Sequence, residues 1–385
     1  MNSTSAPVAE RSAGIDILRG MCALLVVLHH IHLRFKLNDF DVVTLLPRPL
    51  SPVVFHSGHF SVITFFVISG FLITTLSLRR WTSLDRIDWR QFYRLRFARI
   101  APLLLLLIAV LSVLHLAQAP GFVINPERAS LGRAVLAALT FHVNWLEGHH
   151  GYLPGTWDIL WSLSVEEVFY LAFPVMCLLC RNPRWLLAPL LALIVIGPFY
   201  RTSITGQEPW DEYAYLACMD GIAFGCLAAL LTARFRPGPN ALRWMMALGL
   251  SMVLLIVVFR DLAASFGLHK IGLGLTVLEI GVALILIALS QGIGSTILTR
   301  GTGFIRMVGR SSYELYMTHM LVVLAPMPLI VKWQPAGATI PLIYITMLAL
   351  SIALGWIVHK VYSEPMNRIL RSREGHHVLR VQQPQ

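Results

Sequence analysis

Charged residues are scarce in this chain of 385 residues: Asp, Glu, Lys and Arg together make up 13% of it. Soluble domains carry about 25%, and the longest polar stretch here, 79–99, is too short to form a domain. Hydrophobic residues make up 56%, and the mean hydropathy is +0.68. Apolar runs long enough to cross a bilayer recur from end to end. The composition therefore excludes a soluble globular protein and predicts an all-α, polytopic membrane helix bundle.

Cysteine is scarce as well, and all five cysteines lie in apolar stretches. Cys177 and Cys180 have C-x-x-C spacing, but no histidine lies nearby to complete a metal site. His142, His149 and His150 also lack spaced carboxylate or cysteine partners. We therefore expect packing cysteines and no metal site. The five cysteines are Cys22, Cys177, Cys180, Cys218 and Cys226.

Acidic residues are fewer than basic ones, 20 against 31, so the formal net charge is +11. The basic residues are distributed between the apolar runs, which is typical of the positive-inside rule and argues against nucleic-acid binding. A secretory signal is not indicated, because the first apolar run, 15–35, is too long for one and has no small-residue cleavage pattern. We also find no internal repeat.

Ten spans are predicted, and charge determines how the ambiguous apolar run 131–146 is placed. Seven arginines in 79–99 make that segment cytoplasmic. If 131–146 does not cross, the later basic clusters and the tail after 360 are also cytoplasmic. We therefore expect a re-entrant or interfacial helix at 131–146 on the outer side, with both termini cytoplasmic. The predicted spans are 15–35, 58–78, 97–117, 160–180, 185–203, 213–232, 243–259, 271–290, 313–331 and 339–360.

These spans imply three parts. Residues 1–14 form a cytoplasmic N-terminal tail, 15–368 form the membrane domain, and 369–385 form a disordered cytoplasmic C-terminal tail.

The first span contains Arg19 and His30, eleven residues apart. Eleven residues make three helical turns plus roughly 20°, so the two side chains share a face and lie roughly 16 Å apart along the axis. Ionisable groups inside a membrane span usually face the bundle interior and mark a site. Arginine suits an anion, and histidine exchanges protons near neutral pH. The alternative is a structural ion pair of Asp16 with Arg19, together with a core histidine.

The segment FYRLRFARIAP (92–102) places Arg94, Arg96 and Arg99 where a basic loop enters the third span. Juxtamembrane arginines often only contact lipid phosphates. The density of arginine here exceeds what membrane orientation requires, and guanidinium groups bind phosphates bidentately. Coenzyme A, nucleotides and anionic lipid are all suitable ligands.

The segment TWDILWSLSVEEVFYLAFP (156–174) places Ser162, Glu166 and Tyr170 on one helical stripe. The adjacent Glu166 and Glu167 are costly within a span unless they are paired or face water. We expect one carboxylate to orient an imidazole or hold an acceptor hydroxyl. The alternative is an outer-interface position beside Trp157 and Trp161.

Weaker signals lie in three further spans. Ser69 and Gly70 lie in the middle of theirs, where a small residue allows close approach of a ligand or a backbone. Asp220 requires a partner, which could be an arginine. His319, in SSYELYMTHM (311–320), is more often a satisfied core residue than a catalyst.

Together, these motifs and their order resemble the acyltransferase 3 family of bacterial membrane O-acyltransferases over about residues 12–368. The matching segments are the Arg19–His30 helix, FFVISGFLI, RLRFARIAP, WSLSVEEVFY, DGIAFG and SSYELYMTH. Val168 stands where the family usually has glutamine. The chain resembles the standalone form, without the extracytoplasmic hydrolase-like domain that some members carry.

The resemblance implies transfer of an acyl group, usually acetyl, from cytoplasmic acyl-CoA to a hydroxyl of a glycan or another acceptor, in the bacterial inner (plasma) membrane. It implies His30 as the proton-handling residue with Arg19 as its partner, and Arg96 and Arg99 at the CoA phosphates. We further expect catalytic help from Glu166 and donor contacts from Arg94, Ser69 and Gly70. Acceptor contacts are expected from Trp161, Ser162, Glu167, Tyr170 and Asp220.

Two alternatives remain. A proton-coupled transporter or exporter would use the same buried charges as a substrate path, although no two related halves are visible. An O-acyltransferase of a small secreted metabolite, such as a macrolide, would keep the chemistry and change the acceptor.

Overall fold

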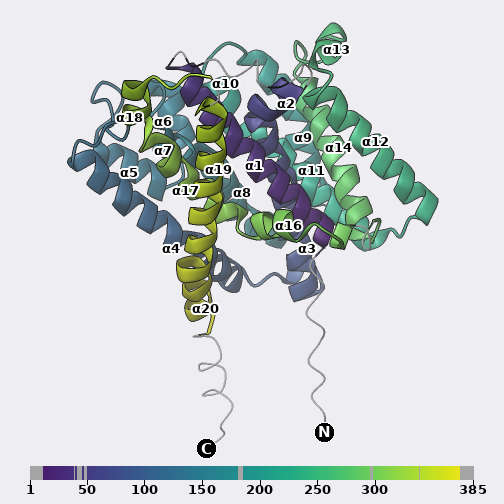
Figure 1. Cartoon of the computed structure of the whole chain (residues 1–385). Coiled ribbons are helices and arrows are strands. Elements are labelled where there is room, and N and C mark those ends of the chain that lie inside the picture. Colours follow the sequence, from purple (N-terminus) through teal and green to yellow (C-terminus); the bar gives the residue numbers. More distant parts are fainter. Residues whose placement is uncertain are drawn as a thin grey trace, which may run out of the picture.

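The structure is a computed structural model that describes residues 12–372 except 39, 41–45, 47–49, 181–184, 295–297 and 338. Within these residues every regular element is a helix (Figure 1). The predicted all-α fold is confirmed. Residues 1–11 and 373–385, which make up most of the two predicted tails, lie outside the described residues.

Among the described residues, nine helical stretches are long and apolar enough to cross a membrane. The tenth predicted span, α9 (Leu187–Ser203), is apolar but has 17 residues. A helix therefore lies at each of the ten predicted positions. The nine stretches are α1 (Ala13–Lys36), α3 (Gly58–Trp81), α4 (Trp89–Leu116), α7 with α8 (Gly155–Asp158, Leu160–Leu179), α10 with α11 (Trp210–Tyr213, Tyr215–Arg234), α12 (Pro239–Val257), α14 (Leu273–Ser290), α17 with α18 (Ser312–Leu324, Met327–Trp333), and α19 (Thr339–Val358) continued by a π-helical turn (His359–Ser363) into α20 (Glu364–Ser372).

The ambiguous run 131–146 forms two short helices, α5 (Leu131–Leu139) and α6 (Val143–His150). Nine helical residues extend about 14 Å, less than half the roughly 30 Å of a bilayer core. The chain breaks between them at Phe141, whose φ is 57°. Neither helix can cross, as predicted. The remaining short helices are α2 (Leu50–Phe55), α13 (Arg260–Ser265), α16 (Gly303–Arg310) and a 3-10 turn (Leu84–Arg86).

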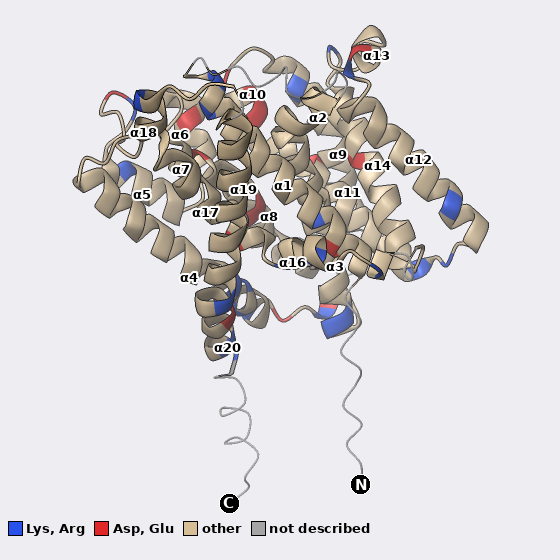
Figure 2. Cartoon of the chain, in the orientation of Figure 1, with Lys and Arg blue, Asp and Glu red and all other residues tan. Residues whose placement is uncertain are grey.

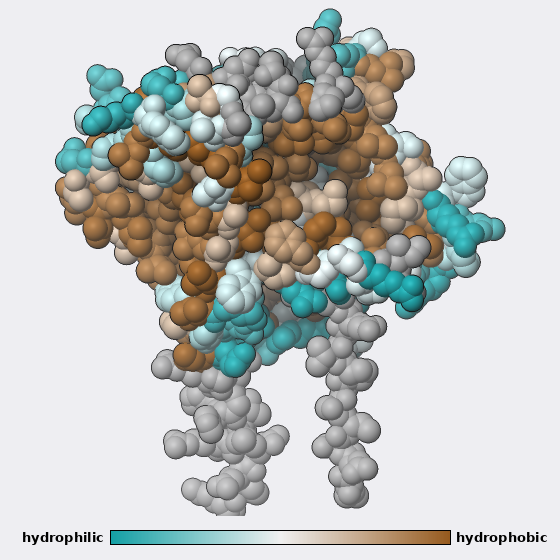
Figure 3. Space-filling model, viewed as in Figure 1, coloured by the Kyte–Doolittle hydropathy of each residue, from teal (hydrophilic) through white to brown (hydrophobic). Residues whose placement is uncertain are grey.

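The outer surface is that of a multi-pass membrane protein. Large apolar side chains such as Leu179, Phe199 and Trp244 are more than 70% exposed, at 78%, 74% and 77%. Figure 3 shows a broad hydrophobic belt across this face with hydrophilic residues at its two ends. Charged residues gather at the same two ends of the bundle (Figure 2). The α20 end is opposite the end that carries α2, α10 and α18 (Figure 1).

Helix α4 begins eight residues before the predicted span 97–117. The Asp88 side chain accepts hydrogen bonds from the backbone N–H groups of Arg90 and Gln91, so Asp88 caps the helix. Arg96 and Arg99 therefore lie on the helix, one turn apart on one face, and not in an entry loop. Pro102 lies inside α4.

The core has two hydrophobic clusters that meet along α1. One is built mainly from α3, α8, α11 and α14 and includes Val26. The other is built mainly from α1, α4, α17 and α19 and includes Val27 and Ile31. His30 lies on the α1 turn between them, and Tyr316 of α17 packs against both clusters.

Gly70 brings α3 and α11 into backbone contact. A Cβ atom at Gly70 would collide with the carbonyl oxygen of Ile222, and one at Gly225 would collide with that of Val67. Small residues allow this close approach between membrane helices. Of the two possibilities that the sequence left open for Gly70, the structure shows the approach of a backbone, that of α11, and it does not support a donor contact at this glycine.

Candidate active site

Helix α1 presents Arg19 and His30 to the same neighbour, α17, as the eleven-residue spacing predicted. The Arg19 guanidinium donates to the Ser312 hydroxyl at 2.9 Å. The His30 imidazole meets that of His319 at 3.1 Å between Nδ1 and Nε2. Because both contacts advance along the two helices in the same direction, α1 and α17 run parallel.

The partners of the two rings assign their protons. His319 Nδ1 lies 2.7 Å from the Tyr316 carbonyl and 3.2 Å from the Leu315 carbonyl, so it carries hydrogen. In the neutral ring Nε2 is then an acceptor. His30 Nδ1 faces this nitrogen and the Val26 carbonyl at 3.0 Å, so it is a donor. The unprotonated nitrogen of His30 is therefore Nε2, which has no hydrogen-bond partner among the described residues and can accept a proton.

Helix α8 places Ser162 beside this histidine pair through Tyr316. The Ser162 and Tyr316 hydroxyls are 2.7 Å apart, and the Tyr316 and His319 ring centroids are 5.9 Å apart. Tyr316 also donates to the Ile159 carbonyl at 3.0 Å. The Ser162 hydroxyl of α8, the Tyr316 hydroxyl and the histidines of α1 and α17 therefore form one polar cluster.

Glu166 lies one helical turn after Ser162 on α8, and no hydrogen bond or ion pair joins it to His30 among the described residues. Its described neighbours are the Ser69 hydroxyl and, electrostatically, Arg96 and Arg19. Of the two roles expected for this carboxylate, orienting the imidazole falls to His319 among the described residues, and holding an acceptor hydroxyl stays a prediction. Glu166 instead joins Arg19 to the arginine cluster of α4.

Two arginines of α4, Arg96 and Arg99, contact residues of neighbouring helices. The Arg96 guanidinium lies 3.9 Å from the ring centroid of Tyr170, in cation–π contact. Arg99 forms an ion pair with Glu314 at 3.3 Å and lies 5.3 Å from the Tyr313 ring. Arg94 is exposed. The face formed by Arg96 and Arg99 is thus turned toward the site, while Arg94 is at its edge.

The predicted stripe is confirmed as helix geometry, because Ser162, Glu166 and Tyr170 lie on the single helix α8 at i, i+4 and i+8. The Tyr170 hydroxyl contacts that of Ser69 on α3. Glu167 is 7% exposed, and one of its carboxylate oxygens has no hydrogen-bond partner among the described residues. Its electrostatic neighbours are Arg96 and Glu166. Tyr170 and Glu167 were expected to contact the acceptor. They lie instead beside Arg96, at the end of the bundle that carries the α4 arginines (the arginine end).

Trp161 lies at the other end of the stripe in a stack of three rings. The Trp161 and Tyr213 rings are nearly parallel at 8°, with centroids 4.3 Å apart, and the His59 ring also stacks on Trp161, with centroids 6.1 Å apart. Tyr213 donates to Asp158 at 2.8 Å. Arg34, one helical turn after His30, interacts electrostatically with Asp158. Aromatic rings and charged groups thus gather at the α10 end of the site.

Glu147 of α6, a helix that does not cross the membrane, contacts the same region of the site through Asp158. It is fully buried, accepts from the Leu153 N–H at 2.9 Å and contacts the Asp158 carboxyl. Burial, followed by repulsion from Asp158, raises the pKa of Glu147 well above its usual range. Glu147 is therefore neutral over a wider pH range than an ordinary carboxyl.

We expect Glu147→Gln to remove part of the pH dependence of stability. In the unfolded chain Glu147 loses its proton at about pH 4.3, whereas the folded form keeps it to higher pH, so wild-type stability falls as pH rises between these values. The amide that this substitution introduces mimics the protonated acid and has no such fall. Thermal unfolding across a pH series measures the difference. Parallel curves for the two proteins would contradict the assignment, and Glu147→Ala is the control that loses both contacts.

Comparison with known proteins identifies the family of this chain. A family model described as an acyltransferase domain matches residues 12–360. The chain belongs to this family. No solved structure gives a significant match.

Three curated relatives are similar to this member of the family. The O-acetyltransferase OatA of Staphylococcus aureus is 29% identical over 215 residues, covering 52% of this chain and 34% of the relative. The peptidoglycan O-acetyltransferase OatA of Listeria monocytogenes is 25% identical, covering 83% and 51%. The acyltransferase MdmB of Streptomyces mycarofaciens is 26% identical, covering 95% and 94%. The chain thus spans between a third and a half of the OatA relatives' length and nearly all of MdmB.

Asp220, expected at the acceptor, lies in a separate buried cluster of this acyltransferase-family bundle. Its carboxylate is 0% exposed and accepts from Arg201 of α9 at 2.7 Å. Arg201 also donates to Thr276 of α14 at 2.7 Å, and Glu279 contacts Asp220. The structure does not support substrate contact by Asp220, because its ion pair is enclosed by three helices.

Asp16 also has a partner that the sequence did not indicate. Its carboxylate accepts from Arg310 of α16 at 3.2 Å. Gly20 and Gly309 allow this approach, because a Cβ atom at either would strike the backbone of the facing helix. Asp16 therefore ties α1 to α16 across a long separation in sequence.

Sequence reasoning undervalued His319 and missed Glu314 as a partner of Arg99. A signal was present in SSYELYMTHM: Ser312, Tyr316 and His319 recur at i, i+4 and i+7, which is one helical face. That face contacts Arg19, Ser162 and His30. A polar stripe of this kind on an apolar helix would have identified α17 as part of the site.

Proposed function

We propose that this membrane protein transfers an acyl group, most simply acetyl, from acyl-CoA to a hydroxyl of a carbohydrate acceptor, with His30 as general base. The observation that carries the proposal is the histidine pair. His30 Nδ1 is held by Val26 and His319, which leaves its Nε2 as the basic nitrogen. General base catalysis requires a positioned, unprotonated nitrogen near the reacting hydroxyl.

The donor would enter at the α20 end, where Arg96 and Arg99 suit the phosphates of CoA. Arg19 and His30 are roughly 16 Å apart along α1, too far to act on the same atom. Arg19, with Glu166 and Ser312, would instead contact the arm of the donor between its phosphates and its thioester. This arrangement suits a long ligand that is charged at one end and reactive at the other.

In the reaction, the acceptor oxygen forms a bond to the thioester carbonyl carbon while His30 Nε2 takes the hydroxyl proton. The carbon–sulfur bond then breaks, and the thiolate of CoA receives that proton from the imidazolium. An acyl-histidine intermediate is the alternative and would release CoA before the acceptor binds. No metal is required, because a thioester is already activated.

The acceptor would approach His30 from the opposite end, past Trp161, Tyr213 and His59. Stacked aromatic rings offer an apolar face with polar edges, which suits a sugar ring. The name of the Listeria relative, a peptidoglycan O-acetyltransferase, agrees with a glycan acceptor. We place the enzyme in the bacterial plasma membrane with the arginine-rich end toward the cytoplasm, where acyl-CoA is available.

The test is equilibrium binding and turnover of radiolabelled acetyl-CoA by the purified protein in detergent. Wild type should bind, and Arg99→Ala should bind at least about tenfold more weakly, because one charge-assisted contact is lost. Arg243→Ala is the matched control, since Arg243 is an exposed arginine on α12. No affinity of the wild type for acetyl-CoA would contradict the donor assignment.

A further inference from the structure

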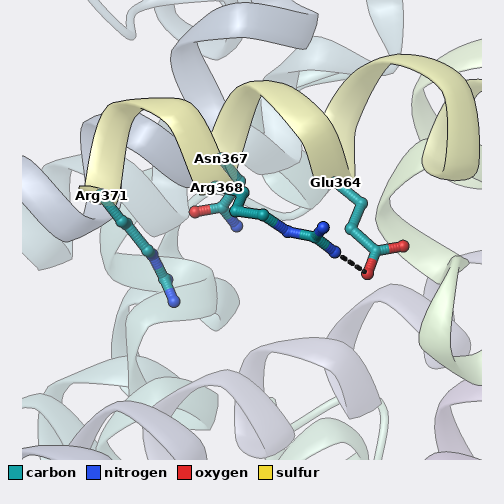
Figure 4. A pocket seen from close by; sticks show the side chains of 4 residues that line it. All are labelled: Glu364, Asn367, Arg368 and Arg371. Atoms are coloured by element: carbon teal, nitrogen blue, oxygen red, sulfur yellow. Dashed lines mark hydrogen bonds and ion pairs between the residues drawn. The ribbon is translucent and has the colours of Figure 1, made fainter. Parts of the chain in front are cut away.

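Helix α20 carries a polar face that the predicted domain boundary divided in two. Glu364, Asn367, Arg368 and Arg371 recur at i, i+3, i+4 and i+7, so they lie on one side of the helix. They line a pocket of about 440 Å³. Figure 4 shows the four side chains extending from the same side of α20. The helix begins after residue 360, beyond the segment matched by the family model.

This helix is fastened to the arginine face of α4. The Tyr362 hydroxyl, in the π-helical turn before α20, donates to the Pro102 carbonyl of α4 at 3.1 Å. In the same turn, His359 lies 3.3 Å from the Glu314 carboxylate, which also holds Arg99 at 3.3 Å. The π-helical turn before α20 is therefore held near Arg99 by two contacts, one to α4 and one to Glu314 of α17.

The charges around the pocket are not balanced. Arg371 lies close enough to Arg80, Arg96 and Arg99 to be repelled by all three. Arg99 is paired with Glu314, and Arg368 is paired with Glu364. Within the part of the chain that the structure describes, Arg371 forms no ion pair with a carboxylate.

Such a group of guanidinium ions is unfavourable alone and becomes favourable around a multiply charged anion. Arg371 of the pocket lies within electrostatic range of Arg96 and Arg99, and the pocket volume of about 440 Å³ is large enough for part of a nucleotide. The ligand that fits both its charge and its place is the phosphorylated nucleotide end of the donor.

We propose that α20 forms one wall of the donor site and that Arg371 binds a phosphate of the nucleotide part of acyl-CoA, with Asn367 beside it as a hydrogen-bonding group. This inference rests on the proposed function. It adds a residue outside the family match to the donor site, and it predicts that Arg371 acts on the nucleotide and not on the acyl or pantetheine part.

The experiment compares the full-length protein with Arg371→Ala and with Arg243→Ala, which removes the same charge from α12. Dissociation constants are measured in phospholipid-free detergent for acetyl-CoA and for S-acetylpantetheine, which lacks the nucleotide. Arg371→Ala should weaken acetyl-CoA binding about tenfold and leave S-acetylpantetheine binding unchanged. Arg243→Ala should match the wild type with both. A further arm adds phosphatidylglycerol as a competitor, because a lipid phosphate has related chemistry.

The outcomes separate the two proposals. If the wild type binds acetyl-CoA and Arg371→Ala behaves as Arg243→Ala does, the role of α20 is overturned and the proposed function remains. If Arg371→Ala weakens the binding of both ligands equally, Arg371 does not contact the nucleotide part, and the inference is also overturned. If phosphatidylglycerol displaces acetyl-CoA from the wild type but not from Arg371→Ala, the pocket is a lipid-headgroup site. If the wild type binds neither donor, the proposed function itself fails.

Discussion

Replacing His30 with alanine is expected to lower the rate of acyl transfer by about a thousandfold, the scale of a lost general base. The side chain lies between the two hydrophobic clusters and makes only one side chain–side chain hydrogen bond within the described residues, to His319. The protein should therefore fold and bind acetyl-CoA as before. The measurement is single-turnover transfer of radiolabelled acetyl to an acceptor, together with the dissociation constant for acetyl-CoA.

The matched control for this substitution is the adjacent histidine. His29 is rotated by about 100° from His30, and its Nδ1 lies 2.8 Å from the Phe55 carbonyl. His29→Asn places an amide donor where Nδ1 was and should retain most activity. Transfer by His30→Ala at the wild-type rate would remove His30 from the mechanism. Equal losses in the two variants would instead indicate a structural effect of this turn of α1.

The second large effect is expected at His319, which we assign as a positioning residue acting through His30. His319→Asn keeps a donor near the Tyr316 carbonyl but cannot reach His30. His319→Gln extends an amide oxygen to where Nε2 accepts the hydrogen bond. We expect the turnover number of His319→Asn to fall about a hundredfold and that of His319→Gln to stay within about tenfold of the wild type, in line with other residues that orient a catalytic group.

The loss at His319 should be smaller than at His30, because the Val26 carbonyl, 3.0 Å from His30 Nδ1, still favours the same tautomer. The KM for acetyl-CoA should not change, since His319 is 0% exposed and lies away from the arginine end. Partial rescue by glutamine distinguishes orientation of His30 from packing alone. If asparagine and glutamine reduce turnover equally, the assigned hydrogen bond has no role in catalysis.

Local patterns in the sequence predicted the part of the site that lies within single helices. Arg19 with His30, and Ser162 with Glu166 and Tyr170, follow from the helical period, and each set faces the bundle as expected. The prediction for α4 erred because the Asp88 cap was overlooked, although an aspartate before a helical run is a common capping signal. The predicted end of the membrane domain at residue 368 falls inside α20, so it separates Arg371 from the other residues of the same polar face.

What the sequence could not supply was which helix faces which. It determined an all-α membrane bundle, a run 131–146 that does not cross, and an arginine-rich end, because hydropathy, length and charge act locally along the chain. Only the tertiary structure shows that His30 contacts His319 and that α3 packs against α11 at Gly70. Only the tertiary structure also shows that Asp220 forms an ion pair with Arg201 and that Arg371 lies near Arg99. These contacts join residues far apart in sequence, and packing of neighbouring helices, which no local pattern encodes, decides them.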